Sequence, residues 1–352
     1  MLAPLLLFAS GSGTKSDFAQ FHVQTWVWVA FLALIAALLT VDLLVVHRVS
    51  HVITTKEAAI ESAVWVSFGL AFTAVVWQAW GTQAAGEYVS GYLIEQSLSV
   101  DNVFVWAIIL SYFAVPREYQ FRVLFWGVFG AVVLRFTFIF AGVALLNAFE
   151  WMLYVFGAFL IFTAYRLLRH EDEEIHPEHN PVLKVVRKVI PSTTTYAGHN
   201  LFTRENAKRL ATPLFAVLIV VETSDVIFAV DSIPAILAVS RHTFIVFSSN
   251  AFAILGLRSM YFVLADLRDK FDYLQPGLAV ILAFVGTKMV IADWVHIPTF
   301  ASLAVIAAVL VVAIVASIKL DRPGGHAPDH VIDAHRGEGL ALLEGDPDPS
   351  AG

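Results

Sequence analysis

The sequence predicts an all-α membrane protein, a polytopic bundle of about nine transmembrane helices with an inverted-topology repeat. Hydrophobic residues make up 58% of the 352 positions, and only 14% are charged. The charged residues cluster between long apolar runs. Lys and Arg also concentrate in alternate connections between those runs. A soluble domain of this composition would have too few polar side chains to cover its surface, so the chain belongs in a bilayer.

Nine runs approach the roughly 20 apolar residues that cross about 30 Å of hydrocarbon. They lie at residues 26–46, 62–80, 90–113, 122–146, 151–168, 213–239, 244–265, 277–294 and 299–319. The runs at 62–80 and 151–168 are short, so a count of eight or ten helices stays open.

The distribution of basic residues predicts the orientation of the bundle. One set of alternate connections holds nearly all of the Lys and Arg residues, whereas the opposite set offers only Lys15 and Arg241. Basic loops stay in the cytoplasm. We therefore expect the N-terminus outside and the C-terminus in the cytoplasm, as an odd number of spans requires.

The chain divides into five parts on this pattern. Residues 1–25 form an N-terminal leader with no basic residue ahead of its first apolar stretch, and residues 26–168 hold helices one to five. A cytoplasmic loop covers residues 169–212, and helices six to nine cover 213–320. Residues 321–352, rich in Gly, Pro, Asp and His, are expected to be a disordered cytoplasmic tail.

Composition also excludes several classes of function. The chain has no cysteine, so disulfides, zinc–thiolate sites and thiol catalysis are excluded. A net charge of −7 gives no basic face for nucleic acid. No phosphate-binding glycine loop is present, so ATP hydrolysis by this chain is not expected. The histidine-containing segments HEDEEIHPEHN and HAPDHVIDAH could collect metal weakly, although solvated polar loops explain them more simply.

Five carboxylates interrupt two of the apolar runs. They are Glu95 and Asp101 in the third run, and Glu222, Asp225 and Asp231 in the sixth. An ionised carboxylate in hydrocarbon costs at least roughly 2.5–3.5 kcal/mol. Each of the five therefore needs a polar partner, a water-filled cavity or a bound cation.

The two acidic runs resemble each other. In EQSLSVDNVF (95–104) and DVIFAVDSIP (225–234), an acid is followed six positions later by an aspartate and then by a small polar residue. The next run along the chain carries an arginine in its interior in both cases, Arg135 or Arg258. Because the two acidic helices are three spans apart, they must cross in opposite directions. This pattern predicts an inverted repeat with a site near the membrane midplane.

Carboxylate, amide and hydroxyl oxygens are ligands for hard divalent cations such as Mg²⁺, Ca²⁺ or Mn²⁺. The candidate metal ligands are Glu95, Asp101, Asn102, Glu222, Asp225, Asp231, Ser232 and Asp42, and the candidate charge-balancing residues are Arg135, Arg258 and Lys288. Structural salt bridges between these two sets are the alternative. Asn250 could be a ligand or a helix-packing amide. No resident cofactor is expected.

The spacing of the acids raises a geometric question. At 100° per residue, Asp101 and Asp231 point about 120° away from Glu95 and Asp225 on a continuous helix. They would then face a neighbouring helix, unless the helix unwinds locally. Pro234 favours unwinding in the sixth run, because it cannot donate to the carbonyl of Val230.

The motifs EQSLSVDNVFVW, ETSDVIFAVDSIPAIL and SSNAFAILGLRSMYF resemble those of the tellurium-resistance protein C (TerC) family of integral membrane proteins. The resemblance covers about residues 39–320. It implies manganese export from the cytoplasm and places the five acids at the acidic transport positions of the family. The residues by themselves indicate only a hard divalent cation.

The leading hypothesis is a secondary transporter in the inner membrane that exports Mn²⁺ through the acidic site, with the lipid bilayer as its surroundings. The surplus of acids suggests exchange against protons, although an uncoupled path stays open. A non-transporting membrane scaffold in tellurite or metal stress is the alternative. An intramembrane aspartyl hydrolase using Asp101 and Asp231 is disfavoured, because the acids outnumber such a pair. We therefore do not expect an enzyme.

Overall fold

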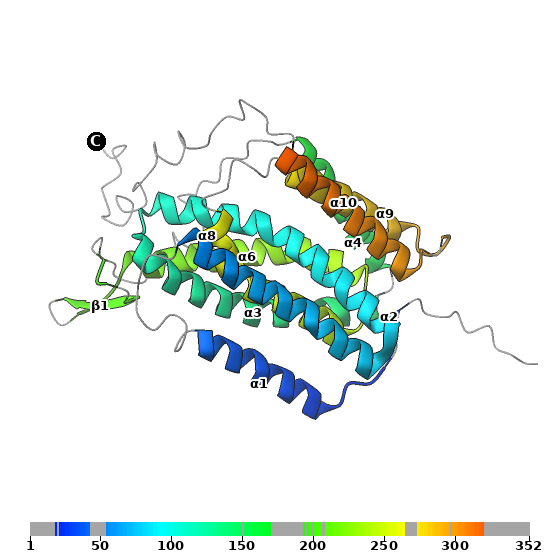
Figure 1. The fold of residues 1–352 in the computed structure, drawn as a ribbon, viewed down its shortest axis with the longest axis horizontal. Coiled ribbons are helices and arrows are strands. Elements are labelled where there is room, and N and C mark those ends of the chain that lie inside the picture. The colour runs from blue at the N-terminus through cyan, green and yellow to red at the C-terminus, as the bar shows by residue number, and fades with distance from the viewer. Residues whose placement is uncertain are drawn as a thin grey trace, which may run out of the picture.

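Long helices that run along a common direction make up the fold, with a small β-hairpin at one end of the bundle (Figure 1). The structure is a computed structural model. It describes residues 18–19, 21–42, 54–149, 151–169, 193, 196–198, 200–205, 208–264, 273–295 and 297–319. Both histidine-containing segments, most of the expected leader and the expected tail lie outside the described residues.

The helices follow the predicted runs closely. In chain order they are α1 (Thr25–Val41), α2 (Thr55–Tyr112), α3 (Arg117–Ala148), α4 (Met152–Arg169), α6 (Pro213–Leu237), α7 (Thr243–Leu255), α8 (Leu257–Leu264), α9 (Leu274–Val290) and α10 (Thr299–Lys319). Strands β1 (Phe202–Glu205) and β2 (Lys208–Ala211) pair antiparallel within the expected cytoplasmic loop, with Phe202 opposite Ala211.

Helix α2 doubles back on itself at Gly81. The hydroxyl of Tyr88 donates to the carbonyl of Gly69 at 2.8 Å, although residues 19 apart lie about 28 Å apart along a straight helix. The ring of Tyr92 also lies over Gly69. The non-helical residue between these positions is Gly81, with φ 85° and ψ −176°. The two arms of α2 therefore form an antiparallel helical hairpin (Figure 1).

The chain is a multi-pass membrane protein. Five described helices, α2, α3, α4, α6 and α10, are long and apolar enough to cross a membrane. A sixth span results if α7 and α8, which meet at a bend of 41°, are one broken crossing. Helices α1 and α9 are apolar but shorter. Five or six spans are thus supported, and the predicted count of nine is not confirmed.

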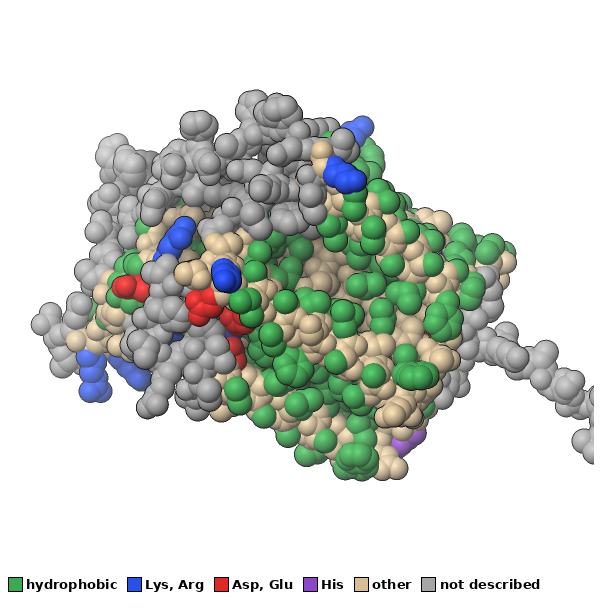
Figure 2. All heavy atoms as spheres, in the orientation of Figure 1, with side chains coloured by type: hydrophobic (Ala, Val, Ile, Leu, Met, Phe, Trp, Pro, Cys, Tyr) green, Lys and Arg blue, Asp and Glu red, His purple; other side chains and the backbone are tan. Residues whose placement is uncertain are grey.

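The surface of the bundle suits a lipid environment. Figure 2 shows hydrophobic side chains spread over the right-hand part of one face, with acidic side chains gathered toward the left. Large apolar side chains such as Phe129 and Val133 of α3 and Val312 of α10 are more than 40% exposed. Exposed side chains of this kind are stable in hydrocarbon, where no charged surface is needed.

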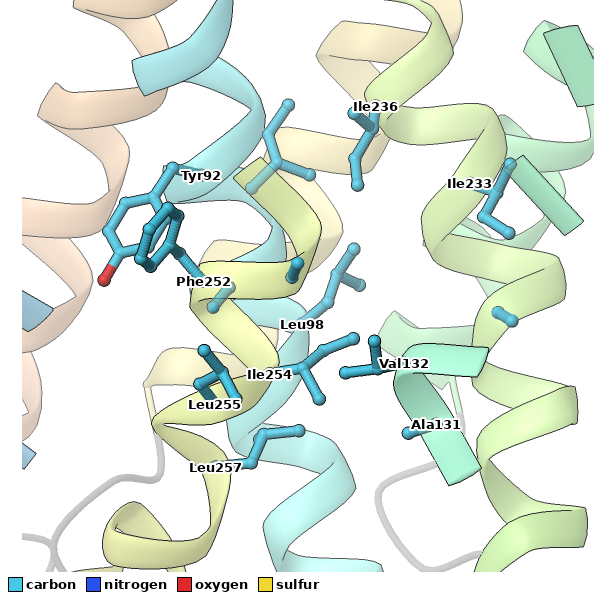
Figure 3. Close-up of a cluster of buried hydrophobic side chains, with 14 of the residues drawn as sticks. Tyr92, Leu98, Ala131, Val132, Ile233, Ile236, Phe252, Ile254, Leu255 and Leu257 are labelled. Atoms are coloured by element: carbon cyan, nitrogen blue, oxygen red, sulfur yellow. The ribbon is translucent and has the colours of Figure 1, made fainter. Parts of the chain in front are cut away.

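Helices α2, α3, α6, α7 and α8 share one buried core, which Figure 3 shows from within. Residues from each of them meet there, including Tyr92, Leu98, Val132, Ile236 and Ile254. Glycines let the backbones approach closely, as small residues do between membrane helices. A Cβ atom on Gly91 would lie 2.9 Å from the Ser249 hydroxyl, and one on Gly127 would lie 3.0 Å from Val221.

A short segment ahead of α1 packs against the turn of α2. The ring of Phe21 stacks on His242 at 3.8 Å and on Trp80 at 4.9 Å between ring centroids. The Nε2 atom of His242 lies 2.9 Å from the carbonyl oxygen of Phe21, and burial lowers the pKa of this histidine. The segment thus covers the end of the bundle where α6 connects to α7.

Because α2 reverses its direction at Gly81, we expect the stability of the protein to depend on a glycine at this position. Replacing Gly81 with Ala adds no clash, since nothing lies within 4 Å of the new Cβ atom. The backbone conformation is essentially restricted to glycine, so we expect a loss of about 1–3 kcal/mol of stability. Thermal unfolding of the purified protein in detergent measures it. Gly256→Ala is the control, because its Cβ atom would make only an ordinary contact at 3.4 Å with Trp65. Equal midpoints for the two variants would contradict the assigned turn.

Candidate functional site

Arg135 lies at the centre of the candidate site. It occupies the middle of α3, is fully buried, and contacts two acids on two other helices. Its Nη1 atom binds Glu95 of α2 and donates to the hydroxyl of Ser232 of α6 at 3.0 Å. Its Nη2 and Nε atoms approach the two carboxylate oxygens of Asp225 at 3.2 and 3.5 Å. The guanidinium therefore connects α2, α3 and α6 at mid-length.

The charges of this buried cluster do not cancel. Two carboxylates, Glu95 and Asp225, share one guanidinium, and both side chains are at most 1% exposed. With every group ionised, the cluster carries one excess negative charge. An uncompensated charge in a low-dielectric interior is costly. The cluster would therefore be stabilised by one proton or by an additional cation.

Several buried polar atoms in and near the cluster have no hydrogen-bond partner among the described residues. They include Oε2 of Glu95, the hydroxyl of Ser99 and Nδ2 of Asn102, which recur on one face of α2. Buried polar atoms usually have partners, so this face is suited to a polar ligand. Asp101 lies within α2 beside them, and its side chain is outside what the structure describes.

Glu222 lies one turn before Asp225 on α6 and packs against α3. A Cβ atom on Gly130 of α3 would collide with the Glu222 carboxylate, so this carboxylate lies directly against the α3 backbone. Oε2 of Glu222 is buried and has no partner among the described residues. This third carboxylate therefore borders the cluster but does not share Arg135.

Asp231 points away from the cluster. Its Oδ1 atom accepts a hydrogen bond of 3.4 Å from Thr163 of α4. Helix α6 continues through Pro234 to Leu237, so the unwinding that this proline suggested does not occur. The third predicted run is likewise helical throughout, since the break in α2 lies earlier, at Gly81. The continuous helix turns Asp231 toward its neighbour, the other alternative that the spacing allowed.

Arg258 forms a separate cluster at one end of the bundle. It binds Asp42, which follows α1, and Glu61 in the first arm of α2. Its guanidinium also lies over the ring of Phe121 at 4.3 Å. The structure thus places two predicted residues, Asp42 and Arg258, together but apart from Arg135. Glu61 was not identified from the sequence, although an acid one residue ahead of an apolar run could have indicated it.

Lys288 lies away from both arginines. It donates to the hydroxyl of Ser302 at 2.9 Å, and its charge interacts with Glu87. Glu87 is fully buried near the Gly81 turn. It accepts hydrogen bonds from the backbone N–H of Ala19 at 2.5 Å and from Ser240 at 2.6 Å. Glu87 was also missed, although it lies just ahead of the run at 90–113.

The predicted ligands therefore fall into three places. Glu95, Asp225 and Ser232 meet at Arg135, Asp42 meets Arg258, and Asp231 faces α4. Within the described residues, no three His, Asp or Glu side chains gather closely enough to hold a metal ion. In this conformation the arginines occupy the positions near the acids where a cation would bind.

Because Arg135 is the shared partner of two buried carboxylates, we expect its replacement to destabilise the protein strongly. In Arg135→Gln both carboxylates lose their buried partner, and we expect a loss of about 3–5 kcal/mol of stability. Adding Glu95→Gln should recover part of the loss, because one buried charge is removed. Thermal unfolding in detergent measures both effects. Arg117→Gln, an exposed position on the same helix, is the matched control. If the double variant is no more stable than Arg135→Gln, the excess charge assigned to the cluster is wrong.

Comparison with known proteins places the chain in a family. The model of the integral membrane protein TerC family matches residues 80–323. An uncharacterized membrane protein of Myxococcus xanthus is 51% identical over 87% of this chain and 95% of its own length. A protein of Escherichia coli K12 named "Putative membrane-bound redox modulator Alx" is 48% identical over 82% of this chain and 92% of its own. No solved structure matches. The chain belongs to the TerC family of integral membrane proteins.

Proposed function

We propose that the protein is a secondary transporter that exports a divalent cation, with Mn²⁺ as its substrate, through the cluster around Arg135. The observation that carries the proposal is the pair of buried carboxylates, Glu95 and Asp225, which share a single guanidinium. A divalent cation would supply the positive charge that this pair lacks. Ionisable residues buried in membrane helices are typical of ion pathways.

Competition between Arg135 and the substrate gives a mechanism. In this structure the guanidinium binds Glu95 and Asp225 and connects α2 to α6. A cation that binds the same carboxylates would displace the guanidinium and loosen that tie. Oxygen ligands from Glu95, Asp225 and Ser232 suit Mn²⁺ and other hard divalent ions. Manganese in particular is proposed on the basis of the family resemblance.

Glu222 is the proposed proton carrier. It borders the cluster, is half-buried against Gly130 and has no arginine partner among the described residues. A carboxyl group in this position could lose its proton when a cation enters nearby, because like charges repel and an added cation favours the ionised form. Export of the cation would then be exchanged against protons.

The proposal includes nine crossings, with the N-terminus outside and the C-terminus in the cytoplasm of an inner-membrane protein. The two arms of α2, the α7–α8 pair, and the apolar helices α1 and α9 supply the additional crossings. In support, α2 begins and ends at the same end of the bundle as the basic hairpin of β1 and β2 (Figure 1). Basic connections are retained in the cytoplasm.

A non-transporting scaffold is the second candidate. The pairing of Arg135 with two acids and of Arg258 with Asp42 and Glu61 favours it, because structural salt bridges would be arranged in the same way. The Escherichia coli relative is named for a redox role. This chain has no cysteine, so any redox role here would not use a thiol of its own.

Replacing the cluster acids should abolish export. Cells that lack their own manganese exporter are expected to accumulate less manganese with the wild-type protein, but not with Glu95→Gln or Asp225→Asn at equal membrane abundance. The reason is that each variant removes one anionic ligand. Glu118→Gln, exposed on α3, is the matched control and should export normally. If both cluster variants export like the wild type, the acids are structural and the scaffold is favoured.

Proton coupling can be separated from transport at Glu222. In proteoliposomes, a pH gradient should drive Mn²⁺ accumulation by the wild-type protein. Glu222→Gln should retain downhill flux, since the ligands of the cluster remain, but should no longer respond to the gradient. Thr223→Ser, a conservative change at the next residue of α6, is the control. Unaltered coupling in Glu222→Gln would assign the proton to another group.

A further inference from the structure

The side chain of Asn250, on α7, is a buried amide. Its side chain is 1% exposed, and neither Oδ1 nor Nδ2 has a hydrogen-bond partner among the described residues. The preceding serines differ, because Ser248 and Ser249 each donate to the carbonyl three residues earlier. A buried amide that serves only packing normally satisfies at least one of its polar atoms.

Two contacts place Asn250 at the level of the Arg135 cluster. Ser249 lies against Gly91 of α2, one helical turn before Glu95. Phe247 packs edge-on against Phe136 of α3, the residue after Arg135, with ring centroids 5.0 Å apart. Residues 247–250 therefore adjoin the two helices that carry Glu95 and Arg135, and Ile236 of α6 approaches the same glycine.

At this level, α2 and α7 each carry a buried polar group that could bind the same cation. Oε2 of Glu95 is fully buried and lacks a partner among the described residues, as Asn250 does. One carboxylate oxygen and one amide oxygen are typical ligands of a hard divalent cation. Because the amide is neutral, it adds a ligand without increasing the repulsion between Glu95 and Asp225.

We propose that Asn250 is an additional ligand of the transported cation, contributed by α7 to the site of Glu95 and Asp225. The inference rests on the proposed transport function and adds one neutral oxygen to its site. A hard amide oxygen in place of a thioether or imidazole ligand favours ions such as Mn²⁺ over softer ones. The site would then involve α2, α6 and α7 around Arg135 of α3.

The test measures both the thermal stability and the Mn²⁺ flux of Asn250→Leu. Leucine has a similar size and removes both unpaired polar atoms, so the unfolding midpoint in detergent should stay unchanged or rise. The KM for Mn²⁺ flux into proteoliposomes should rise by about tenfold or more, the scale on which loss of a metal-supporting group lowers affinity. Ser259→Ala is the control, because the hydroxyl of this buried serine of α8 donates to the carbonyl of Gly256 within its own helical segment.

A second variant keeps the test decisive if Asn250→Leu folds poorly. Asn250→Gln retains a neutral amide oxygen, so a KM close to that of the wild type would support the proposal. Reduced midpoints with impaired flux in both variants would assign Asn250 to packing and overturn it. Wild-type flux in Asn250→Leu would overturn it as well.

The inference and the proposed function fail in different ways. If the wild-type protein moves Mn²⁺ and Glu95→Gln does not, the proposed function holds, and only the Asn250 result decides the inference. If the wild-type protein moves no divalent cation, both are wrong.

Discussion

The pairing of one buried guanidinium with two buried carboxylates determines the arrangement of the bundle. Arg135 must reach Glu95 on α2 and Asp225 on α6 at once, and this requirement sets the register of three helices. Removing one partner of a buried ion pair costs more free energy than forming the pair gains. The pairing therefore does more to select this arrangement of helices than to increase the free energy of unfolding. Gly127 and Gly130 of α3 lie against Val221 and Glu222 of α6, so these two helices approach each other closely beside the pairing.

The central cluster could be predicted because a charge in an apolar run has few stable alternatives. Glu95, Asp225, Ser232 and Arg135 were all identified from the sequence, and the structure brings them together. The partners of Arg258 were harder to predict. Arg258 occupies the matching place in the second half of the predicted repeat, yet it binds Asp42 and Glu61 near the bundle end. Sequence spacing along one helix does not determine which neighbouring helix a long side chain reaches.

The helices were predicted well and their interruptions were not. Hydropathy separated the runs at 62–80 and 90–113, but the residues between them are helical apart from a single turn residue, Gly81. Their polar composition suggested a longer connection, because composition does not reveal that one glycine can reverse the chain. Pro234 led to the opposite error, because it suggested a break where the helix is continuous. A proline near the last turn of α6 removes one backbone hydrogen bond and leaves the helix intact.

The hairpin turn of α2 also bears on how this region enters a membrane. Its two arms meet at one glycine, so no polar loop separates them at that end of the bundle. The pair could therefore insert as a single unit, without transfer of a hydrophilic segment across the hydrocarbon. For the same reason the turn contains no loop into which an epitope tag, a glycosylation acceptor or a protease site could be inserted. Reporters that map sidedness at this end of the molecule belong in the connection between α6 and α7, where the backbone is already outside a helix.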